Sequence, residues 1–409
     1  MKFLSVVVGV MFASACSGDS SDTDEVVGVD SATSSLETLR DHGGYGGHDG
    51  IKLGSRAARL AIARGASRLV SLQADTIGDN ARNGLDDPDP DDGGWDFLLP
   101  SSATSHSAAT SPPNIFGETG LGVWAAVDSR LAGTRALVAA LDAGAGMQRN
   151  PDIDSAPDLV FGVLLAELAD NPGFAGLARE RYDAKRAANG GAVGLGTLIR
   201  DARHRSNEDG LIAYDLSWFA LGASALDAAF PGAGYDADAE TYAGIVVDDL
   251  TSAAPRFNPD DPTEGFYVTG LAWSQVATDL VGARAAFRRV RARLLDEQHG
   301  NGAWGDSAAH PADDLQSTAY ALETLALTDR PTQRTRTASQ RAIRFLVRAQ
   351  ATSGGWPDAT GVESPLGDGD IVLALALSST STGDDGLVPE ALAVAPANGD
   401  AAGLASPSP

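Results

Sequence analysis

The chain has 409 residues with 55 acidic and 30 basic side chains, which gives a formal net charge of −25 at pH 7. A surface of this sign repels phosphate and anionic lipid, so we expect neither a nucleic-acid partner nor direct binding to a charged membrane surface. Cys16 is the only cysteine, which excludes a disulfide framework and a cysteine nucleophile from the folded part of the chain.

The first 50 residues indicate export and attachment rather than a fold. Residues 1–15 carry one early lysine, an apolar run and three small residues, which is the form of a secretory signal peptide. The sequence Ala-Ser-Ala-Cys also resembles a bacterial lipobox, in which Cys16 would be lipidated. This resemblance implies a lipid-anchored cell-envelope protein, joined to the membrane only by that lipid and by a disordered tether over 16–50. The alternative is an ordinary signal peptide cut after Ala15.

Helix-favouring sequence begins near residue 55. Apolar residues at helical spacing predict a helix over 55–73, and an acidic insert follows it. Within that insert, residues 89–92 spell D-x-D-D, which resembles the acid motif of proton-initiated terpene cyclases. Its flanking prolines and the abundance of aspartate favour coincidence. A small-residue loop then holds His106 and leads into a predicted helix over 116–128.

From there to about residue 380, two kinds of predicted helix alternate. Helices with charged residues on a solvent-facing side are expected over 132–147, 173–188, 237–253, 284–298 and 336–350, and all of them except 237–253 carry arginine. Helices that are apolar almost all round, and therefore buried on every side, are expected over 157–169, 211–229, 264–281, 313–328 and 368–379. An extra helix over 193–203 interrupts the alternation, and no segment indicates a β-strand. The sequence predicts one all-α domain over 51–380 with six helical hairpins, followed by a disordered tail over 381–409.

A short motif recurs where helices of the first kind end. Its spacing is Q-x-x-x-G-x-W, interrupted by the acidic insert in the first copy. The three copies are Gln73 with Gly93 and Trp95, Gln298 with Gly302 and Trp304, and Gln350 with Gly354 and Trp356. We interpret each as a turn that Gly permits and a buried Trp stabilises. The pattern resembles the repeat of squalene-hopene cyclases and protein prenyltransferases, which implies a single α/α toroid, an (α/α)6 barrel, and no particular reaction.

In such a toroid the beginnings of the inner helices converge on one mouth. Carboxylates in a first helical turn often act as caps, but acids from several helices around one cavity would raise one another's pKa values and supply a proton donor or a base. The sixth hairpin must close against the first, so residues far apart in the chain should meet. The candidate catalytic residues are His106, Glu118, His310, Asp313 and Asp314. The candidate substrate-binding residues are Asp158, Tyr214, Trp218, Tyr267, Tyr320, Asp368 and Asp370.

Three functions fit this pattern. We prefer an enzyme that acts on an extracytoplasmic glycan, of the uronate lyase or epimerase type, because AQATSGGWP resembles the helix turn of α/α-toroid polygalacturonate lyases. The negative chain would then need Ca²⁺ or local arginines to hold an acidic oligosaccharide. The alternatives are a non-catalytic lipoprotein that binds a small molecule or partner, and a terpenoid cyclase-like isomerase, against which the aromatic content of 6% counts.

The lining of the cavity would decide among these functions. An open, acidic lining edged by Trp and Tyr favours a glycan, because sugar rings stack on accessible aromatic faces. A closed, aromatic lining favours an isoprenoid, because carbocations need dry aromatic surroundings. A filling of Leu and Phe favours no ligand.

Overall fold

A computed structural model describes residues 56–74, 93–103, 117–149, 156–328 and 332–378. Within these ranges the chain forms thirteen α-helices and one pair of two-residue strands. The elements are α2 (Arg56–Leu72), β1 (Leu99–Pro100), α3 (Gly117–Asp128), α4 (Thr134–Arg149), α5 (Ala156–Leu168), α6 (Gly173–Ala188), α7 (Ala192–Arg205), α8 (Gly210–Ala229), α9 (Tyr235–Thr251), α10 (Tyr267–Leu280), α11 (Arg284–Asp296), α12 (Leu315–Leu327), α13 (Gln333–Ala349), β2 (Val362–Glu363) and α14 (Pro365–Leu377). The fold is all-α, as predicted. None of the described helices is both long and apolar enough to cross a membrane.

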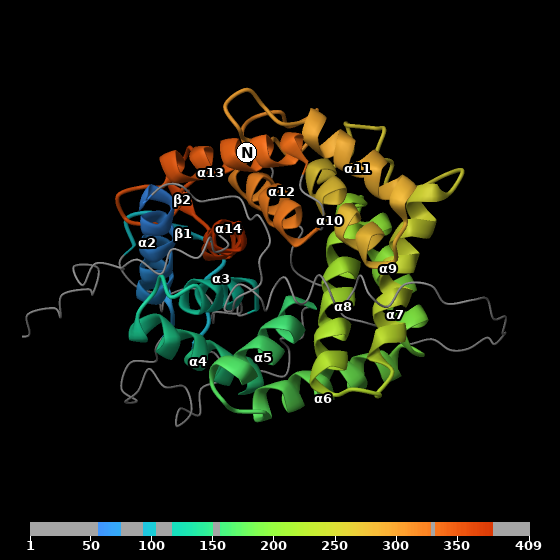
Figure 1. The fold of residues 1–409 in the computed structure, drawn as a ribbon, viewed down its shortest axis with the longest axis horizontal. Coiled ribbons are helices and arrows are strands. Elements are labelled where there is room, and N and C mark those ends of the chain that lie inside the picture. The colour runs from blue at the N-terminus through green and yellow to red at the C-terminus, as the bar shows by residue number, and fades with distance from the viewer. Residues whose placement is uncertain (1–55, 75–92, 104–116, 150–155, 329–331, 379–409) are drawn as a thin grey trace, which may run out of the picture.

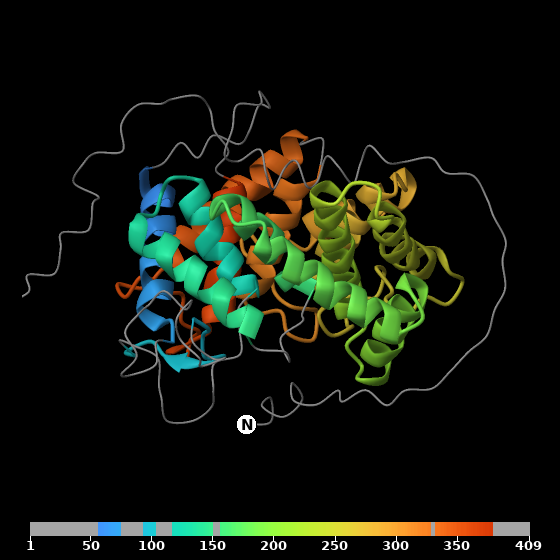
Figure 2. The ribbon, with the colours of Figure 1, turned by 90° about the horizontal axis from the view of Figure 1, so that it is seen from below.

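The helices form two concentric rings (Figure 1). The inner ring consists of α3, α5, α8, α10, α12 and α14, in which each helix contacts the next and α14 packs against α3. The outer ring consists of α2, α4, α6, α9, α11 and α13, with α7 inserted between α6 and α9 and with α13 in contact with α2. Figure 2 shows the ring from its edge, with α2 at the left and the helices from α7 to α9 at the right. The closed ring confirms the predicted α/α toroid of six hairpins.

The two rings differ in burial as the sequence indicated. Every residue of the inner helix α10 is buried, because its neighbours surround it. The outer helix α11 buries only Phe287, Val290, Arg291 and Leu294. Its other side chains are partly or fully exposed to solvent. A helix without a polar face is stable only inside such a ring, whereas an amphipathic one can cover it.

The three Gln–Trp turns have the same geometry. Each indole N–H donates to a carbonyl near the end of the preceding outer helix: Trp95 to Leu69, Trp304 to Leu294 and Trp356 to Leu346, at 2.7–2.8 Å. Each Gln side chain donates to its own turn and to the following outer helix, the latter contacts being Gln73 to Ala139, Gln298 to Ala338 and Gln350 to Ala61. The structure confirms the stapling role. The contact of Gln350 joins α13 to α2 and so helps to close the ring.

Both the backbone conformation and the close packing of the next outer helix require glycine in each turn. Gly302 has a φ of 103°, which disfavours any side chain. A Cβ there would also lie 2.4 Å from the carbonyl oxygen of Arg341 on the next outer helix. Gly93 and Gly354 make the corresponding close approaches to α4 and α2. The turns therefore hold successive hairpins at a spacing that only glycine allows.

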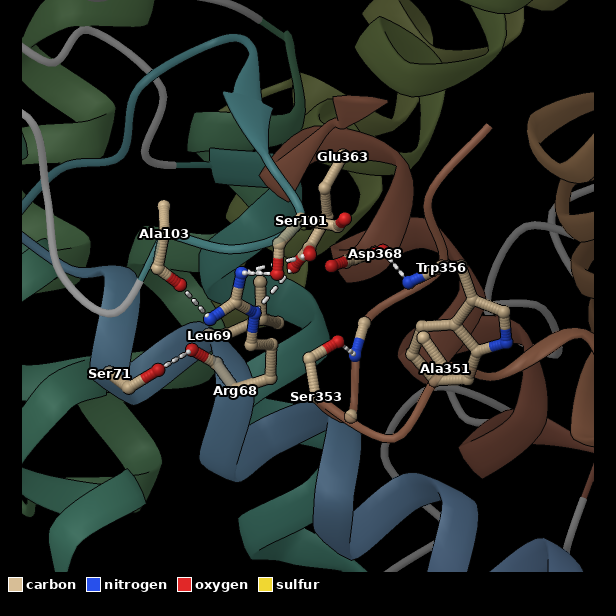
Figure 3. Close-up of polar contacts among 12 residues, drawn as sticks. Arg68, Leu69, Ser71, Ser101, Ala103, Ala351, Ser353, Trp356, Glu363 and Asp368 are labelled. Carbon is tan, nitrogen blue, oxygen red and sulfur yellow. Dashed lines mark hydrogen bonds and ion pairs between the residues drawn. The ribbon is translucent and has the colours of Figure 1, made fainter. Parts of the chain in front are cut away.

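A buried ion pair joins the two ends of the described chain (Figure 3). Arg68 on α2 donates to both carboxylate oxygens of Glu363, from Nε to Oε1 at 2.7 Å and from Nη2 to Oε2 at 2.9 Å. Asp368 accepts the backbone N–H of Trp356 at 2.9 Å, and burial together with its hydrogen bond to Glu363 raises the pKa of Asp368. Beside this group, β1 pairs antiparallel with β2. The sequence indicated no strand here, since two residues are too few to show an alternating pattern.

Candidate functional site

Carboxyl groups from four inner helices gather at the centre of the ring. Glu118 and Asp158 stand in the first turns of α3 and α5, Glu323 lies within α12 and Asp370 within α14. Burial in the ring is the main cause that raises the pKa of Glu118, and the nearby Asp370, Asp158 and Glu323 raise it further. The predicted meeting of the first and sixth hairpins is thus confirmed for Glu118 and Asp370.

Two glycines allow these helices to come so close. A Cβ on Gly122 would lie 2.4 Å from the carbonyl oxygen of Gly369, where α3 packs on α14. A Cβ on Gly117 would lie 2.2 Å from Oδ1 of Asp158. Any side chain at either glycine would push the helices apart. The acids therefore interact because the backbone of α3 is bare at these points.

Asp370 has a defined hydrogen-bond environment and is only 2% exposed. The side-chain amide of Gln316 donates to Oδ2 of Asp370 at 3.0 Å and to the hydroxyl oxygen of Tyr320 at 2.9 Å. The Tyr320 hydroxyl also hydrogen-bonds to Asp370. Burial raises the pKa of Asp370 to about 7, and the hydrogen bonds from Gln316 and Tyr320 limit the rise. Asp370 therefore holds a proton up to neutral pH, as a general acid must.

Glu323 is a second buried acid, which the sequence did not indicate. Its side chain is fully buried, and neither of its oxygens has a hydrogen-bond partner among the described residues. Burial and then the nearby Asp370 raise its pKa well above the usual range. Glu323 lies two turns into α12, whereas the predicted site residues lie near helix beginnings. It is the only charged residue of that helix, and a helix buried on all sides buries its single acid too.

Four aromatic side chains form a cluster beside the acids. Tyr214 and Trp218 come from α8, Trp273 from α10 and Tyr320 from α12. Ring centroids lie 4.8 Å apart for Trp218 and Trp273, 5.4 Å for Tyr214 and Trp273, and 5.3 Å for Tyr214 and Tyr320. The structure thus brings together three predicted substrate-binding residues, and it adds Trp273. Because Tyr320 also contacts Asp370, the aromatic cluster and the acids form one site.

This site concentrates polar atoms that lack partners. The hydroxyl of Tyr214, the indole nitrogens of Trp218 and Trp273, and both oxygens of Glu323 are buried without a hydrogen-bond partner among the described residues. Proteins satisfy more than about 90% of their buried polar groups with protein partners or ordered water. These atoms are therefore positions at which water or a ligand could bind.

The inserted helix α7 reaches this region through Arg203. Its guanidinium donates to both oxygens of Asp215, at 2.6 Å and 3.2 Å, and to Glu208 at 2.7 Å. Asp215 belongs to α8 and is one of the acids whose charge raises the pKa of Glu118. The predicted helix over 193–203 therefore exists and contacts the edge of the acid group.

Three of the predicted catalytic residues have other partners. Asp313 is exposed and contacts His299 at 2.7 Å and Asn301 at 2.6 Å. Asp314 caps α12 by accepting the N–H of Ser317 at 2.6 Å. The imidazole of His310 is 53% exposed and lies 3.9 Å from Asp306. These contacts belong to the turn before α12 and give the three residues no link to Asp370, because a residue that precedes an inner helix can face outward.

Two predicted substrate-binding residues form contacts that stabilise the fold outside the acid and aromatic site. Tyr267 is buried and donates to the carbonyl of Pro259 at 2.8 Å, which fixes the loop before α10. Asp368 belongs to the group around Glu363 described above. Asp158 lies close to Glu118 and contributes to the rise of its pKa. His106, Cys16 and the D-x-D-D sequence at 89–92 lie outside the described residues.

Within the described part of the chain, no group of three or more His, Cys, Asp or Glu side chains is arranged to hold a metal ion.

No family model matches the chain. Among curated proteins, drimenyl diphosphate synthase from Streptomyces showdoensis is 39% identical over 110 residues, which is 25% of this chain and 20% of that protein. The match thus spans about a fifth of the relative's length.

Solved structures with a similar course of the chain include the type II terpene cyclase MstE from Scytonema. It matches 79% of this chain and 98% of its own at 12% identity, with a TM-score of 0.47. A possible member of the GH105 family from Salmonella enterica matches 78% of this chain and 93% of its own at 11% identity, with a TM-score of 0.37. These likenesses concern the fold, and the toroid itself is established by the two rings of helices.

Proposed function

We propose that the protein is a proton-initiated isomerase of the terpenoid cyclase type, acting on an acyclic isoprenoid. The observation that carries this proposal is the contact between a buried acid, protonated up to neutral pH, and a cluster of aromatic rings. Tyr320 makes that contact. Its hydroxyl hydrogen-bonds to Asp370, and the centroid of its ring lies 5.3 Å from that of Tyr214. The partial identity to drimenyl diphosphate synthase supports the same class of substrate.

In the proposed reaction, Asp370 donates its proton to a carbon–carbon double bond of the substrate. The carbocation that forms is attacked by the next double bond, which closes a ring and moves the positive charge along the chain. Loss of a proton from carbon then ends the reaction, and that proton returns to the carboxyl groups. Atoms and charge balance without a co-substrate, so the product is an isomer of the substrate.

The surroundings of Asp370 suit both states of this acid. Before transfer, burial keeps the proton on Asp370, and burial also raises the pKa of Glu323. After transfer, hydrogen bonds from Gln316 and Tyr320 stabilise the carboxylate. The faces of Tyr214, Trp218 and Trp273 supply electron density, and a desolvated cation gains up to about 2 kcal/mol from each well-placed ring.

The same observations count against the glycan reading that the sequence favoured. Trp218 is 1% exposed and Trp273 is fully buried, so neither presents an open face to a sugar ring. The aromatic content of 6% is low, but composition does not show location, and four of these residues stand together beside the acids. A closed, aromatic surrounding is the arrangement expected for an isoprenoid.

A deuterium-labelling experiment tests the proposal. The full-length protein is incubated in D₂O with farnesyl diphosphate or geranylgeranyl diphosphate, and products are analysed by mass spectrometry after removal of the diphosphate. We expect a cyclic isomer that carries a single deuterium, because Asp370 exchanges its proton with solvent before each turnover. Asp370→Asn should abolish this product.

Asp313→Asn is the matched control. It removes a carboxylate that the sequence pointed to, but one that is exposed and bonded to His299. This variant should retain the wild-type rate. Equal activity of wild type and Asp370→Asn, or loss of activity in Asp313→Asn alone, would contradict the assignment of the acid.

A further inference from the structure

Glu323 is a buried acid that serves no contact of the fold. Its side chain is fully buried, and neither carboxyl oxygen has a hydrogen-bond partner among the described residues. The next residue on α12 differs, because the buried hydroxyl of Thr324 accepts from the side-chain amide of Gln275 at 2.8 Å and donates to the carbonyl of Tyr320 at 2.9 Å. The packing of α12 against α10 therefore leaves the carboxyl group of Glu323 available for chemistry.

Glu323 lies deeper in the toroid than Asp370. Gln316, Tyr320 and Glu323 are at positions i, i+4 and i+7 of α12, a spacing that puts three side chains on one face of a helix. The first two contact Asp370. Glu323 thus lies on the face of α12 that meets this acid, one helical turn further from the beginning of the helix than Tyr320. That step measures about 4.5 Å along the helix axis.

The aromatic side chains continue in the same direction. On α8, Trp218 follows Tyr214 by four residues and lies one turn deeper. The ring of Tyr214 is 5.3 Å from that of Tyr320, and the ring of Trp218 is 4.8 Å from that of Trp273, measured between centroids. Trp273 in turn lies 6.1 Å from Tyr320. A carbocation formed beside Asp370 would therefore stay close to aromatic faces as it moves inward.

We propose that Glu323 ends the reaction by removing the last proton from the substrate, one turn deeper than the acid that starts it. This assignment rests on the proposed function. It also limits the size of the product. Carbon–carbon bonds are about 1.5 Å long, so a step of about 4.5 Å spans only a few bonds. The cation reaches Glu323 after closure of one or two rings, and the product is a cyclic alkene with one or two rings.

The protons balance within the two acids. Burial raises the pKa of Glu323, which favours its protonated form before the reaction. When Asp370 protonates the first double bond it is left as a carboxylate, and Glu323 then passes its own proton to Asp370, directly or through a bound water. Interacting carboxyl groups share protons in this way, and the cation favours the negative charge on the carboxyl group nearest to it.

The last step restores both acids. Glu323, now a carboxylate, takes a proton from the carbon next to the cationic carbon, and the electrons of that C–H bond form the new double bond. Asp370 and Glu323 are then both protonated again. No co-substrate is consumed, in agreement with an isomerisation.

The products of Glu323→Gln test the assignment in the D₂O assay with farnesyl diphosphate or geranylgeranyl diphosphate. Gln has the size of Glu but cannot take a proton from carbon. We expect the variant still to convert the substrate and to add one deuterium, since Asp370 is intact, but to lose the main wild-type isomer. Alkenes with another double-bond position, or an alcohol formed with water, should replace it. Glu180→Gln is the control, because Glu180 is an exposed residue of α6, and it should give the wild-type product.

Glu323→Asp provides a second test. It keeps a carboxyl group but withdraws it by one carbon, so part of the wild-type isomer should return. Thermal unfolding confirms that each variant is folded. The assignment is overturned if Glu323→Gln forms the wild-type product at the wild-type rate, if the folded variant adds no deuterium, or if the wild-type product has more than two rings. A wild type that forms no deuterated cyclic isomer at all would instead refute the proposed function, and the assignment with it.

Discussion

Replacing Asp370 by Asn should remove the activity and yet stabilise the protein at alkaline pH. Asn has nearly the shape of Asp, can accept from Gln316 through its oxygen and can donate to Tyr320 through its amide. It cannot ionise. The substitution therefore separates the hydrogen-bonding role of residue 370 from the cost of a buried charge.

The magnitude follows from the pKa of Asp370, which burial raises from 3.8 to about 7. A raised pKa in the folded state means that this group's contribution to stability is fully present below about pH 3.8 and is lost as pH rises through about 7. Each pKa unit corresponds to about 1.4 kcal/mol, so the shift of about three units costs the wild type on the order of 4 kcal/mol above neutrality. The Asn variant escapes that cost.

Urea denaturation of both proteins between about pH 4 and pH 8.5 measures this difference. We expect the two free energies of unfolding to be similar near pH 4 and the variant to become the more stable one as pH rises. The difference between the two proteins reports on the ionisation of residue 370 together with its effect on Glu118 and Glu323, whose pKa values the charge of Asp370 raises. A difference independent of pH would refute the reasoning that Asp370 is a buried neutral acid.

Four further predictions concern the fold, a cap and the N-terminus. Trp356→Ala should lower the free energy of unfolding by about 3–5 kcal/mol in urea titrations, because a buried ring and its hydrogen bond are lost; an unchanged midpoint would contradict this. Gly302→Ala should cost at least about 2 kcal/mol by the same assay, through its positive φ and the clash with α13. Asp314→Ala should lower the free energy of unfolding by about 1 kcal/mol, because the N-cap of α12 is lost, and it should leave turnover unchanged. A loss of turnover in a folded variant would indicate that Asp314 is catalytic. We propose that Cys16 is lipidated; Cys16→Ala should then move the protein from the membrane to the soluble fraction on cell fractionation, and unchanged membrane association would count against the lipid.

Most of the fold could be predicted because its determinants are local. The apolar inner helices and the solvent-facing outer helices have distinct patterns, and the Gln–Trp motif fixes where one ends. The ladder between β1 and β2 could not be predicted, because two residues carry no period and their pairing depends on ring closure. The partner of Arg68 could not be predicted either, since Glu363 lies almost 300 positions away.

The site was predictable only in part, for a geometric reason. Helix beginnings identified Glu118 and Asp370, but they also identified Asp313 and Asp314, which have the same sequence character and face other groups. Spacing along the chain does not tell which side of a turn faces the ring axis. Glu323 and Trp273 lie deeper in their helices, where the useful signal is a single polar or aromatic residue in an otherwise aliphatic helix.

The hydrogen bond from Gln350 to Ala61 helps to close the six hairpins into a ring. An open array of repeats exposes an apolar face at each terminus and needs capping repeats to cover it. Here the last hairpin covers the first, so every inner helix has two neighbours and no hairpin is terminal in space. The first described helix, α2, packs on the last, α14, and a circularly permuted chain that starts at another hairpin would keep the same contacts. Removing one hairpin, by contrast, would uncover two faces at once, so closure itself fixes the number of repeats.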